Sequence, residues 1–587
     1  MLQFKFKVME MAFIQRLCKS LQTPALIKRY SDAAIGLVFI ICSQLFVVPI
    51  QVALDLHSIN IPASILVMLL VFFTMTIASS ISGNVSDFYN RHLRGPTDFV
   101  GRHMSLGFVA FFVLLIRDHV SNSLDIPRLA GVFVLTTIVS YVISYVLAYG
   151  GFHLEHRLRR RRRAAVDIEN NNKALPSPSI AWPAPPCERR SNIIDQLSPL
   201  SEALVTKEPL VKTSAVSDSS TTASIDFVLR TAPIWIWLFL LITVGLPLYL
   251  ATGYMMPFEV FSFTLFWVLS IQFQRCLRDS ETLARFHRIR TFVLIFCNPL
   301  LLTWALATAY MWTKAFCAGK DISVVVGDFR HYSSLARCIM HLMQDSRMHA
   351  HLGAGDLAGI LLDAGVACMG FKMYEYRSEL WASLGTVSFT CAALAVVNVF
   401  VNVLIGHGIG LQAEDAIAFA GRSATLALGI PAIENLGGSA TLASTIAIFS
   451  GIVFQMAGDW LFSVLRINDR VSRDGQARPL KVRTSSNKHA SSCETTLVGS
   501  TEEKQNGRKD GRTATDDDDD DDDEGTMVVA GVTVGINGAA MGTAWLIERD
   551  SRAVAYSALA MIVFGAVTVA LTAIPAAAQA IRWLTTI

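Results

Sequence analysis

Apolar residues in this chain come in long stretches that alternate with short polar ones. A helix needs about 20 apolar residues to cross the hydrocarbon core of a bilayer, where its backbone must satisfy its own hydrogen bonds. The pattern therefore predicts an all-α fold, a polytopic transmembrane helical bundle of about 12–13 spans that includes interrupted or re-entrant helices. Continuous spans are expected at Ala33–Leu54, Ile61–Ile81, Phe99–Ile116, Pro127–Gly150, Pro233–Ala251, Phe258–Gln274, Phe292–Trp312, Leu357–Phe371, Trp381–Ile405, Ala440–Leu465 and Ala553–Ile574.

Charges are segregated between these spans, and they set the expected topology. Only 17% of residues are charged, and the formal charge of +3 is small because the basic run Arg157–Arg163 and the acidic run Asp516–Asp523 nearly cancel. Basic short loops stay on the inner side of a membrane. The turn Arg91-His92-Leu93-Arg94 and the basic run are therefore expected inside. The acidic run is expected inside too, if the apolar stretch Ala416–Asn435 is re-entrant.

Changes in composition divide the chain into four units. Residues 1–32 form a basic N-terminal segment, and residues 33–155 form a membrane block of four helices. Residues 156–230 combine the basic run with a Pro-, Ser- and Thr-rich linker that is too polar to fold by itself. Residues 231–587 form a second membrane block with a hydrophilic insert, 466–526, which is expected to be disordered because its aspartates repel one another.

Two apolar segments of the second block are badly suited to a continuous helix. Residues 419–439 and 530–543 mix glycines with hydroxyl side chains, and the first also contains Arg422 and Pro431. In secondary transporters, interrupted helices of this kind direct half-helix N-termini toward an anionic substrate. An arginine at membrane depth costs several kcal/mol without a partner and is therefore a candidate functional residue. The predicted substrate-binding residues are Arg422, Ser423, Thr425, Asn537 and Thr543, with structural glycines at Gly437, Gly438, Gly538 and Gly542.

Other interpretations of the same residues stay open. The small residues also allow tight helix packing. Arg422 could pair with Glu434 or Asp415 and only hold the fold, whereas in the substrate interpretation Thr543 would meet Arg422 and Thr425 from the opposite side.

Few other residues suggest chemistry. Asp363, inside a predicted span, and Asp356, at its start, are candidates for a proton relay, although Asp356 also suits a helix cap. His341, His349 and His351 lack a supporting carboxylate pattern, so no metal site is predicted. No cofactor is expected. No nucleophile, zinc or phosphate-loop motif occurs in a loop, so we expect no enzyme.

Several motifs resemble one known family. The stretch from Gly421-Arg-Ser-Ala-Thr-Leu-Ala to Gly437-Gly-Ser-Ala-Thr-Leu-Ala443 resembles the core signature of the LrgB/CidB family, and Gly538-Ala-Ala-Met-Gly-Thr-Ala544 resembles its second signature. In the N-terminal block, Ile61-Pro-Ala-Ser64 and Gly101-Arg-His-Met-Ser-Leu-Gly-Phe108 look like the LrgA/CidA partner. The whole is similar to a fused LrgA–LrgB protein, the arrangement of the plastidial glycolate/glycerate translocators, and the polar linkers favour a fungal relative. The chain has Gly421 and Ala539 where the family usually has Pro and His.

The resemblance implies a secondary, alternating-access transporter of small monocarboxylates such as glycolate, glycerate or pyruvate. The alternative is a holin- or antiholin-like regulator of membrane permeability or lysis. The expected partners are a small organic acid and the lipid bilayer, with no nucleic acid, and a homo-oligomer is left open. The chain is expected to be an integral multi-pass protein, with the mitochondrial inner membrane and the plasma membrane as alternatives.

Overall fold

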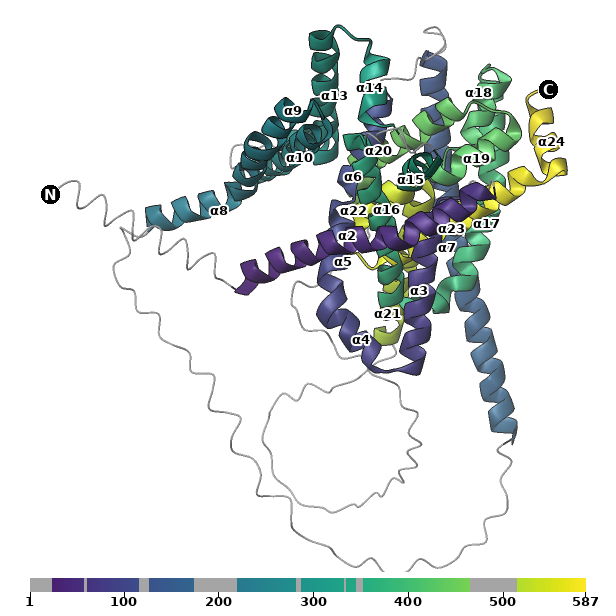
Figure 1. Cartoon of the computed structure of the whole chain (residues 1–587). Coiled ribbons are helices and arrows are strands. Elements are labelled where there is room, and N and C mark those ends of the chain that lie inside the picture. Colours follow the sequence, from purple (N-terminus) through teal and green to yellow (C-terminus); the bar gives the residue numbers. More distant parts are fainter. Residues whose placement is uncertain are drawn as a thin grey trace, which may run out of the picture.

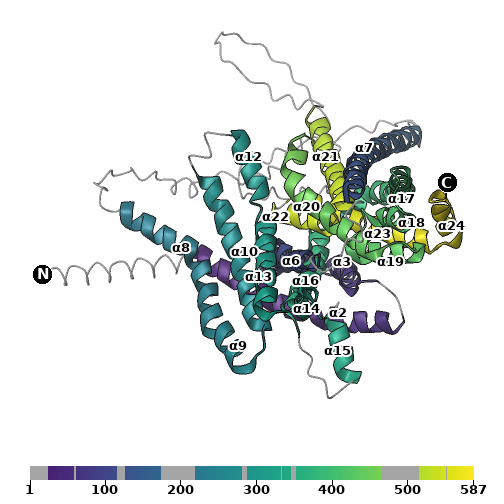
Figure 2. The same ribbon diagram turned by 90° about the horizontal axis from the view of Figure 1, so that it is seen from above.

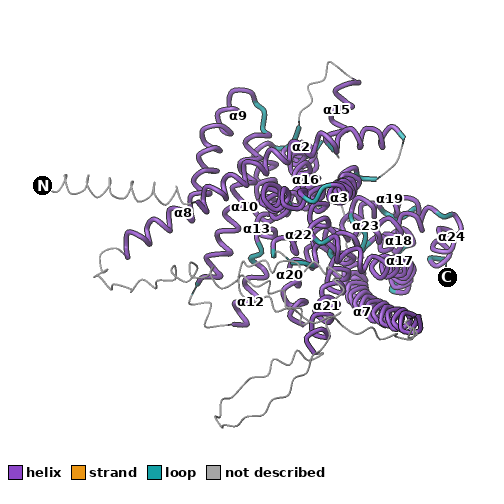
Figure 3. Tube along the Cα trace, turned by 90° about the horizontal axis from the view of Figure 1, so that it is seen from below, coloured by secondary structure: helices purple, strands orange, loops and turns teal. Residues whose placement is uncertain are grey.

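The computed structural model describes residues 24–57, 61–115, 126–173, 219–280, 287–331, 334–344, 352–464, 515–549 and 551–586. Every regular element within these ranges is a helix (Figures 1 and 3). Ten of the helical segments described are long and apolar enough to cross a membrane. The prediction of a polytopic all-α membrane protein is confirmed.

The N-terminal block contains the four predicted spans. Its elements are α2 (Pro24–Leu56), α3 (Ala63–Ile81), α4 (Asn84–Phe88), η1 (Tyr89–Leu93), α5 (Arg94–His103), α6 (Ser105–Leu114) and α7 (Ile126–Lys173). The predicted turn at 91–94 is wrong, because the chain passes through it as one turn of π-helix, η1. α7 also continues through the basic run to Lys173, while residues 174–218 of the predicted linker lie outside the described residues.

A second group of helices follows along the chain, and α8, α9 and α10 of this group lie to one side of the bundle when it is seen from above (Figure 2). It consists of α8 (Ser219–Leu240), η2 (Leu241–Gly245), α9 (Leu246–Thr252), α10 (Met256–Asp279), α12 (His287–Phe296), α13 (Pro299–Ala318), α14 (Ile322–Phe329) and α15 (Leu335–Gln344). The predicted span Phe292–Trp312 is wrong. Asn298 caps a new helix with its side chain and Pro299 occupies the first turn, a strong start signal that divides the apolar stretch.

The third group holds the interrupted helices. It consists of α16 (Ala354–Glu375), α17 (Arg377–Gly408), α18 (Ala413–Ala418), η3 (Phe419–Gly421), α19 (Leu426–Leu436), α20 (Ala440–Val464), α21 (Thr515–Asn537), α22 (Ala539–Glu548), α23 (Ala553–Ala573) and α24 (Pro575–Leu584). α21 begins at Thr515, so the backbone of the aspartate run is helical where a disordered insert is predicted. The buried part of α21, from Gly525 onward, supplies the stable helix that this run extends. Residues 465–514 of that insert lie outside the described residues.

The N-terminal block and the third group pack as one body through glycines. A Cβ on Gly370 of α16 would collide with the Met68 carbonyl of α3, and one on Gly107 of α6 would come within 2.9 Å of the Ala358 carbonyl of α16. Such close backbone approach is the usual way in which membrane helices gain packing energy. α7 likewise lies against α17 and α21, so the N-terminal block forms part of the walls around the interrupted helices.

Candidate functional site

The first interruption lies between η3 and α19. Helical backbone ends at Gly421, and Thr425 is extended (φ −59°, ψ 144°) immediately before the first residue of α19. α19 then ends at Gly437, whose φ of +77° is costly for residues with a Cβ, and Gly438 follows in close contact with Ile417. The chain is thus interrupted within the predicted stretch 419–439, and the assignment of Gly437 and Gly438 as structural glycines stays a prediction.

The second interruption separates α21 from α22 at Gly538 and Ala539. Ala539 has a φ of +46° and is the one non-glycine residue with positive φ in the described parts of the chain. A Cβ on Gly538 would lie 2.9 Å from the Cα of Gly542, and one on Gly542 would lie 2.8 Å from the Val534 side chain. The two glycines therefore let α22 fold back closely on α21, as the prediction of structural glycines requires.

One cavity of about 490 Å³ touches both interruptions. Thr425 and Leu426 line it from the first break, and Gly538, Ala539 and Ala540 line it from the second. α19 and α22 both begin at this cavity. Helix N-termini carry partial positive charge and unpaired amide groups, so they favour an anion in the space between them. The Thr425 hydroxyl is buried and has no hydrogen-bond partner among the described residues.

The remaining walls of the cavity come from α2, the start of α3, α6, the residues around α15, α16, α20 and α23. They bring charged and amide side chains that sequence reasoning passed over, namely Gln44, Gln51, Asp55, Arg330 and Arg337. Arg337 pairs with Asp55 at 3.6 Å, and its side chain is 52% exposed, so this pair lies at the rim. The available sequence signal is weak. It is the position of Arg330 directly after the apolar helix α14.

Arg422 is buried, but it faces α7 and not the cavity. Its guanidinium donates to the Thr136 carbonyl at 3.2 Å and to the Thr137 hydroxyl at 2.7 Å. It forms no ion pair with a carboxylate in the described part of the chain, so the predicted pairing with Glu434 or Asp415 is wrong. The reason is that α7, which belongs to the N-terminal block and is distant from Arg422 in the sequence, supplies the oxygen acceptors.

Two turns of α7 hold both interruptions in place. We call Thr136, Thr137, Ser140 and Ser144 the α7 polar strip. Ser140 lies 3.3 Å from the Ser423 hydroxyl and accepts from the Asn398 amide of α17 at 3.2 Å. Ser144 accepts from the Asn537 amide, one residue before the second break, at 2.7 Å. Arg422, Ser423 and Asn537 therefore bind the strip and position the breaks, and Thr425 is the predicted binding residue that lines the cavity.

The other predicted residues are separated. Thr543 does not meet Arg422 or Thr425, because its hydroxyl lies 2.8 Å from Ser557 on α23 and donates to the Ala539 carbonyl at 2.9 Å. Asp356 caps α16 by accepting from the Gly353 amide at 2.9 Å, whereas Asp363 lines the cavity. No cluster of three or more metal-ligating side chains occurs in the part of the chain that is described, and His349 and His351 lie outside it.

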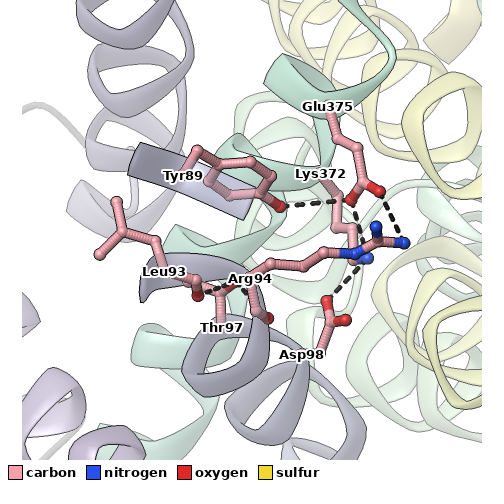
Figure 4. A network of polar contacts seen from close by, with 7 residues as sticks. All are labelled: Tyr89, Leu93, Arg94, Thr97, Asp98, Lys372 and Glu375. Carbon is pink, nitrogen blue, oxygen red and sulfur yellow. Dashed lines mark hydrogen bonds and ion pairs between the residues drawn. The ribbon is translucent and has the colours of Figure 1, made fainter. Parts of the chain in front are cut away.

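A buried charge cluster lies at the opposite end of α16 (Figure 4). Lys372 bridges Asp98 at 2.7 Å and Glu375 at 3.0 Å, and Arg94 reaches the other oxygen of Glu375 at 3.0 Å. Two cations and two anions balance, so the cluster is neutral. It lies about 14–18 Å along α16 from Asp363 at 1.5 Å per residue, and residues 364–374 between them are buried. The cavity is therefore closed toward this end.

The π-helical turn η1 positions Tyr89 and Arg94 at this cluster. Its hydrogen bond runs from the Arg94 amide to the Tyr89 carbonyl, five residues back. In an α-helix, residues five apart point about 140° away from each other. The wider turn brings both side chains to Glu375, where the Tyr89 hydroxyl donates at 3.2 Å (Figure 4).

Comparison with known proteins agrees with this membrane architecture. Residues 283–477 match the LrgB-like family. In this segment the chain is similar to the LrgB-like family. Over 142 residues it is 25% identical to the holin-like protein CidB of Staphylococcus epidermidis, which covers 24% of this chain and 62% of that protein. Over 125 residues it is 20% identical to CidB of Staphylococcus aureus, covering 21% and 55%. No solved structure matches.

The LrgB-like segment covers part of the site. It contains α16, α17 and the first interruption, and it ends before α21. The chain spans less than two thirds of the length of these two CidB proteins. The second interruption, the α7 polar strip and the first half of the charge cluster lie outside the matched residues.

Proposed function

We propose that this protein carries small monocarboxylate anions, of the glycolate, glycerate or pyruvate type, across a membrane by alternating access. One observation carries the proposal: a single cavity contacts the first residues of both half-helices, α19 and α22. Two helix N-termini that converge on one cavity give an anion amide donors and a favourable field.

The size and lining of the cavity suit a small acid. A volume of about 490 Å³ exceeds the requirement of a two- or three-carbon acid and leaves room for water. The Thr425 hydroxyl would donate to the acid, and Leu426, Ile430 and Ile448 would contact its carbon atoms. The substrate class itself comes from the family resemblance, as does the LrgA-like role proposed for residues 33–155. In this proposal the protein is a carrier, not an enzyme.

A holin-like role in permeability is the second candidate. The relatives that match are holin-like proteins by name. A pore needs a continuous path, whereas the cavity here ends at the buried stretch 364–374 and the charge cluster beyond it. Closure at one end and access at the other favour a carrier with two alternating states.

Flux measurements separate the two candidates. Purified protein in liposomes should show saturable uptake of a radiolabelled 2-hydroxy or 2-oxo acid that speeds up when the same acid is loaded inside. Thr425→Val should raise the apparent KM about two- to tenfold, because it loses one hydrogen bond of about 0.5–1.5 kcal/mol. The matched control, Thr543→Val, removes a buried hydroxyl outside the cavity lining and should leave KM unchanged. Unsaturable leakage of acids and neutral solutes alike would favour the holin-like role.

A further inference from the structure

Arg422 carries a buried positive charge that no carboxylate in the described parts of the chain balances. The phenol of Tyr141 lies within electrostatic range, and a phenol is neutral at ordinary pH. The centre of the Phe133 ring lies 5.6 Å from the guanidinium carbon, a contact that brings no net charge. A buried charge is costly because it has lost its water, unless an opposite charge takes the place of that water.

The guanidinium also keeps one donor in reserve. Nη1 and Nη2 donate to the Thr136 carbonyl and the Thr137 hydroxyl of the α7 polar strip. Nε is buried and has no hydrogen-bond partner among the described residues. A buried donor without an acceptor is destabilising, so the polar strip explains how Arg422 is oriented but leaves Nε unexplained.

A second side chain on a neighbouring helix is unpartnered in the same way. Asn402 of α17 is buried, and both its amide nitrogen and its amide oxygen lack a hydrogen-bond partner in the described part of the chain. Residues four apart lie on the same face of a helix. Asn398, one turn earlier, donates to Ser140 of α7 at 3.2 Å, so Asn402 lies on the face of α17 that is turned toward α7.

The register of the two helices brings Asn402 to the level of Arg422. A Cβ on Gly151 of α7 would lie 2.8 Å from the Thr390 hydroxyl of α17. Together with the bond from Asn398 to Ser140, this contact shows that α7 and α17 run antiparallel, and it sets Asn402 level with Thr136. The Thr136 carbonyl is the acceptor of Arg422, and α17 also packs on η3, which directly precedes Arg422.

We infer that Arg422 and Asn402 bind a chloride ion between α7, α17 and η3. Nε of Arg422 and the amide nitrogen of Asn402 donate to the ion, and its single negative charge balances the guanidinium. A cation would be repelled by Arg422, and a water molecule would accept a hydrogen bond without supplying charge. Every group at this level is buried, which favours a small ion that gives up its water readily. The inference goes beyond the proposed function and does not depend on it.

Bound chloride would hold the first interruption in place. The ion joins the residue after η3 to α17, as the polar strip joins it to α7. A ligand that binds the folded state stabilises it in proportion to the logarithm of its concentration above Kd. Chloride should therefore stabilise the protein even when no substrate is present.

Thermal unfolding of the full chain in detergent tests this without any transport measurement. The unfolding midpoint is measured while sodium chloride replaces sodium sulfate at constant ionic strength. The midpoint of the wild-type protein should rise with chloride and level off, by about 3–5 °C at a hundredfold excess over Kd. Sulfate serves as the reference because it is larger, doubly charged and strongly hydrated.

Two substitutions and a matched control locate the ion. Asn402→Leu removes a donor to the ion and should abolish most of the chloride-dependent rise. Arg422→Gln removes the charge and should abolish it as well, and Asn402→Leu stands alone as the test if Arg422→Gln does not fold. The control is Asn398→Leu, the same change one turn away. It should lower the midpoint in both salts, because the bond to Ser140 is lost, and keep the full rise with chloride.

Three results would overturn the assignment. Equal midpoints of the wild-type protein in chloride and sulfate would show that no chloride binds. A full chloride-dependent rise in Asn402→Leu would place the ion elsewhere. If glycolate in sulfate raises the midpoint and Asn402→Leu abolishes that rise, the position belongs to the transported acid and not to chloride. None of these results bears on saturable uptake in liposomes, so the chloride site and the carrier function can fail separately.

Discussion

At the scale of single residues, the sequence indicates that Arg422 is buried and has a specific task, but it does not indicate in which direction its side chain points. Its side chain is 2% exposed, as expected for a residue with a specific task. The task differs from the predicted one, because Nη1 and Nη2 of the guanidinium donate to α7. Thr425, three residues later, is the side chain that reaches the cavity.

Substitution of Arg422 should therefore affect stability more than substrate affinity. Arg422→Lys should leave the apparent KM within about twofold and lower the melting temperature, because Lys cannot reproduce the two-pronged contact with Thr136 and Thr137. Arg422→Ala should destabilise the protein by about 3–6 kcal/mol, since two hydrogen bonds to a charged group are lost and each contributes about 1.5–3 kcal/mol. Uptake kinetics and thermal unfolding in detergent measure the two effects. A tenfold rise in KM in well-folded Arg422→Lys would contradict this assignment.

Ala539 gives a second prediction at this scale. A left-handed backbone costs a residue with a Cβ about 1–2 kcal/mol, a penalty that glycine does not have. Ala539→Gly should raise stability by up to about 1 kcal/mol once the greater entropy of the unfolded chain is subtracted. Ala540→Gly, at the next position and already helical, is the control and should lower stability. Thermal unfolding of the two variants in parallel should show shifts of opposite sign.

At the scale of elements, each interruption is fixed by its partners on both sides. The breaks contact the α7 polar strip with their polar residues and the cavity with Thr425 and Ala539. At the other end of the bundle, α5 and α16 meet through the charge cluster of Arg94, Asp98, Lys372 and Glu375. This contact joins the N-terminal block to the helix that carries Asp363.

The cluster should behave as a coupled unit. Lys372→Met alone leaves Asp98 and Glu375 buried with a single cation, which should cost about 3–5 kcal/mol. The double variant Asp98→Asn/Lys372→Met keeps the neutral pair of Arg94 and Glu375, so its loss should be clearly smaller than the sum of the single losses. A double-mutant cycle on the unfolding free energy measures the difference, and strictly additive losses would show that the charges act independently.

At the scale of the whole molecule, the N-terminal block and the third group form one body. α3 and α6 pack on α16 through glycines, and α7 lies against α17 and α21. The polar strip on α7 satisfies buried groups of both interruptions, so neither half can complete the site alone.

A chain divided after residue 195 should therefore reassemble. Two fragments, 1–195 and 196–587, produced together should copurify in mild detergent through an affinity tag on either one, because the buried faces of α3, α6 and α7 have their partners in the other fragment. The two fragments should not copurify when fragment 196–587 also carries Gly370→Leu, because the new side chain would collide with the backbone of α3. Retention of both fragments despite that substitution would contradict the packing.

The sequence by itself determined that the protein lies in a membrane and that some of its helices are interrupted. Long apolar stretches decide a membrane fold because an unpaired backbone group in hydrocarbon costs several kcal/mol wherever the helix lies. The glycines predict interrupted helices because they weaken the continuous hydrogen-bond ladder, whereas Pro431 lies inside α19. These are local effects, so they can be recognised along the chain.

Only the tertiary structure decided which side chains share a space. The α7 polar strip, about 280 residues from Arg422 in the sequence, accepts hydrogen bonds from this side chain, which the sequence suggested as a substrate ligand. Arg330 and Asp363 line the same cavity from two separate elements, and a π-turn brings Arg94 to Glu375. The direction of a side chain depends on how helices are rotated and packed against one another. Those rotations follow from close contacts between distant glycines and backbones, and no local pattern encodes them.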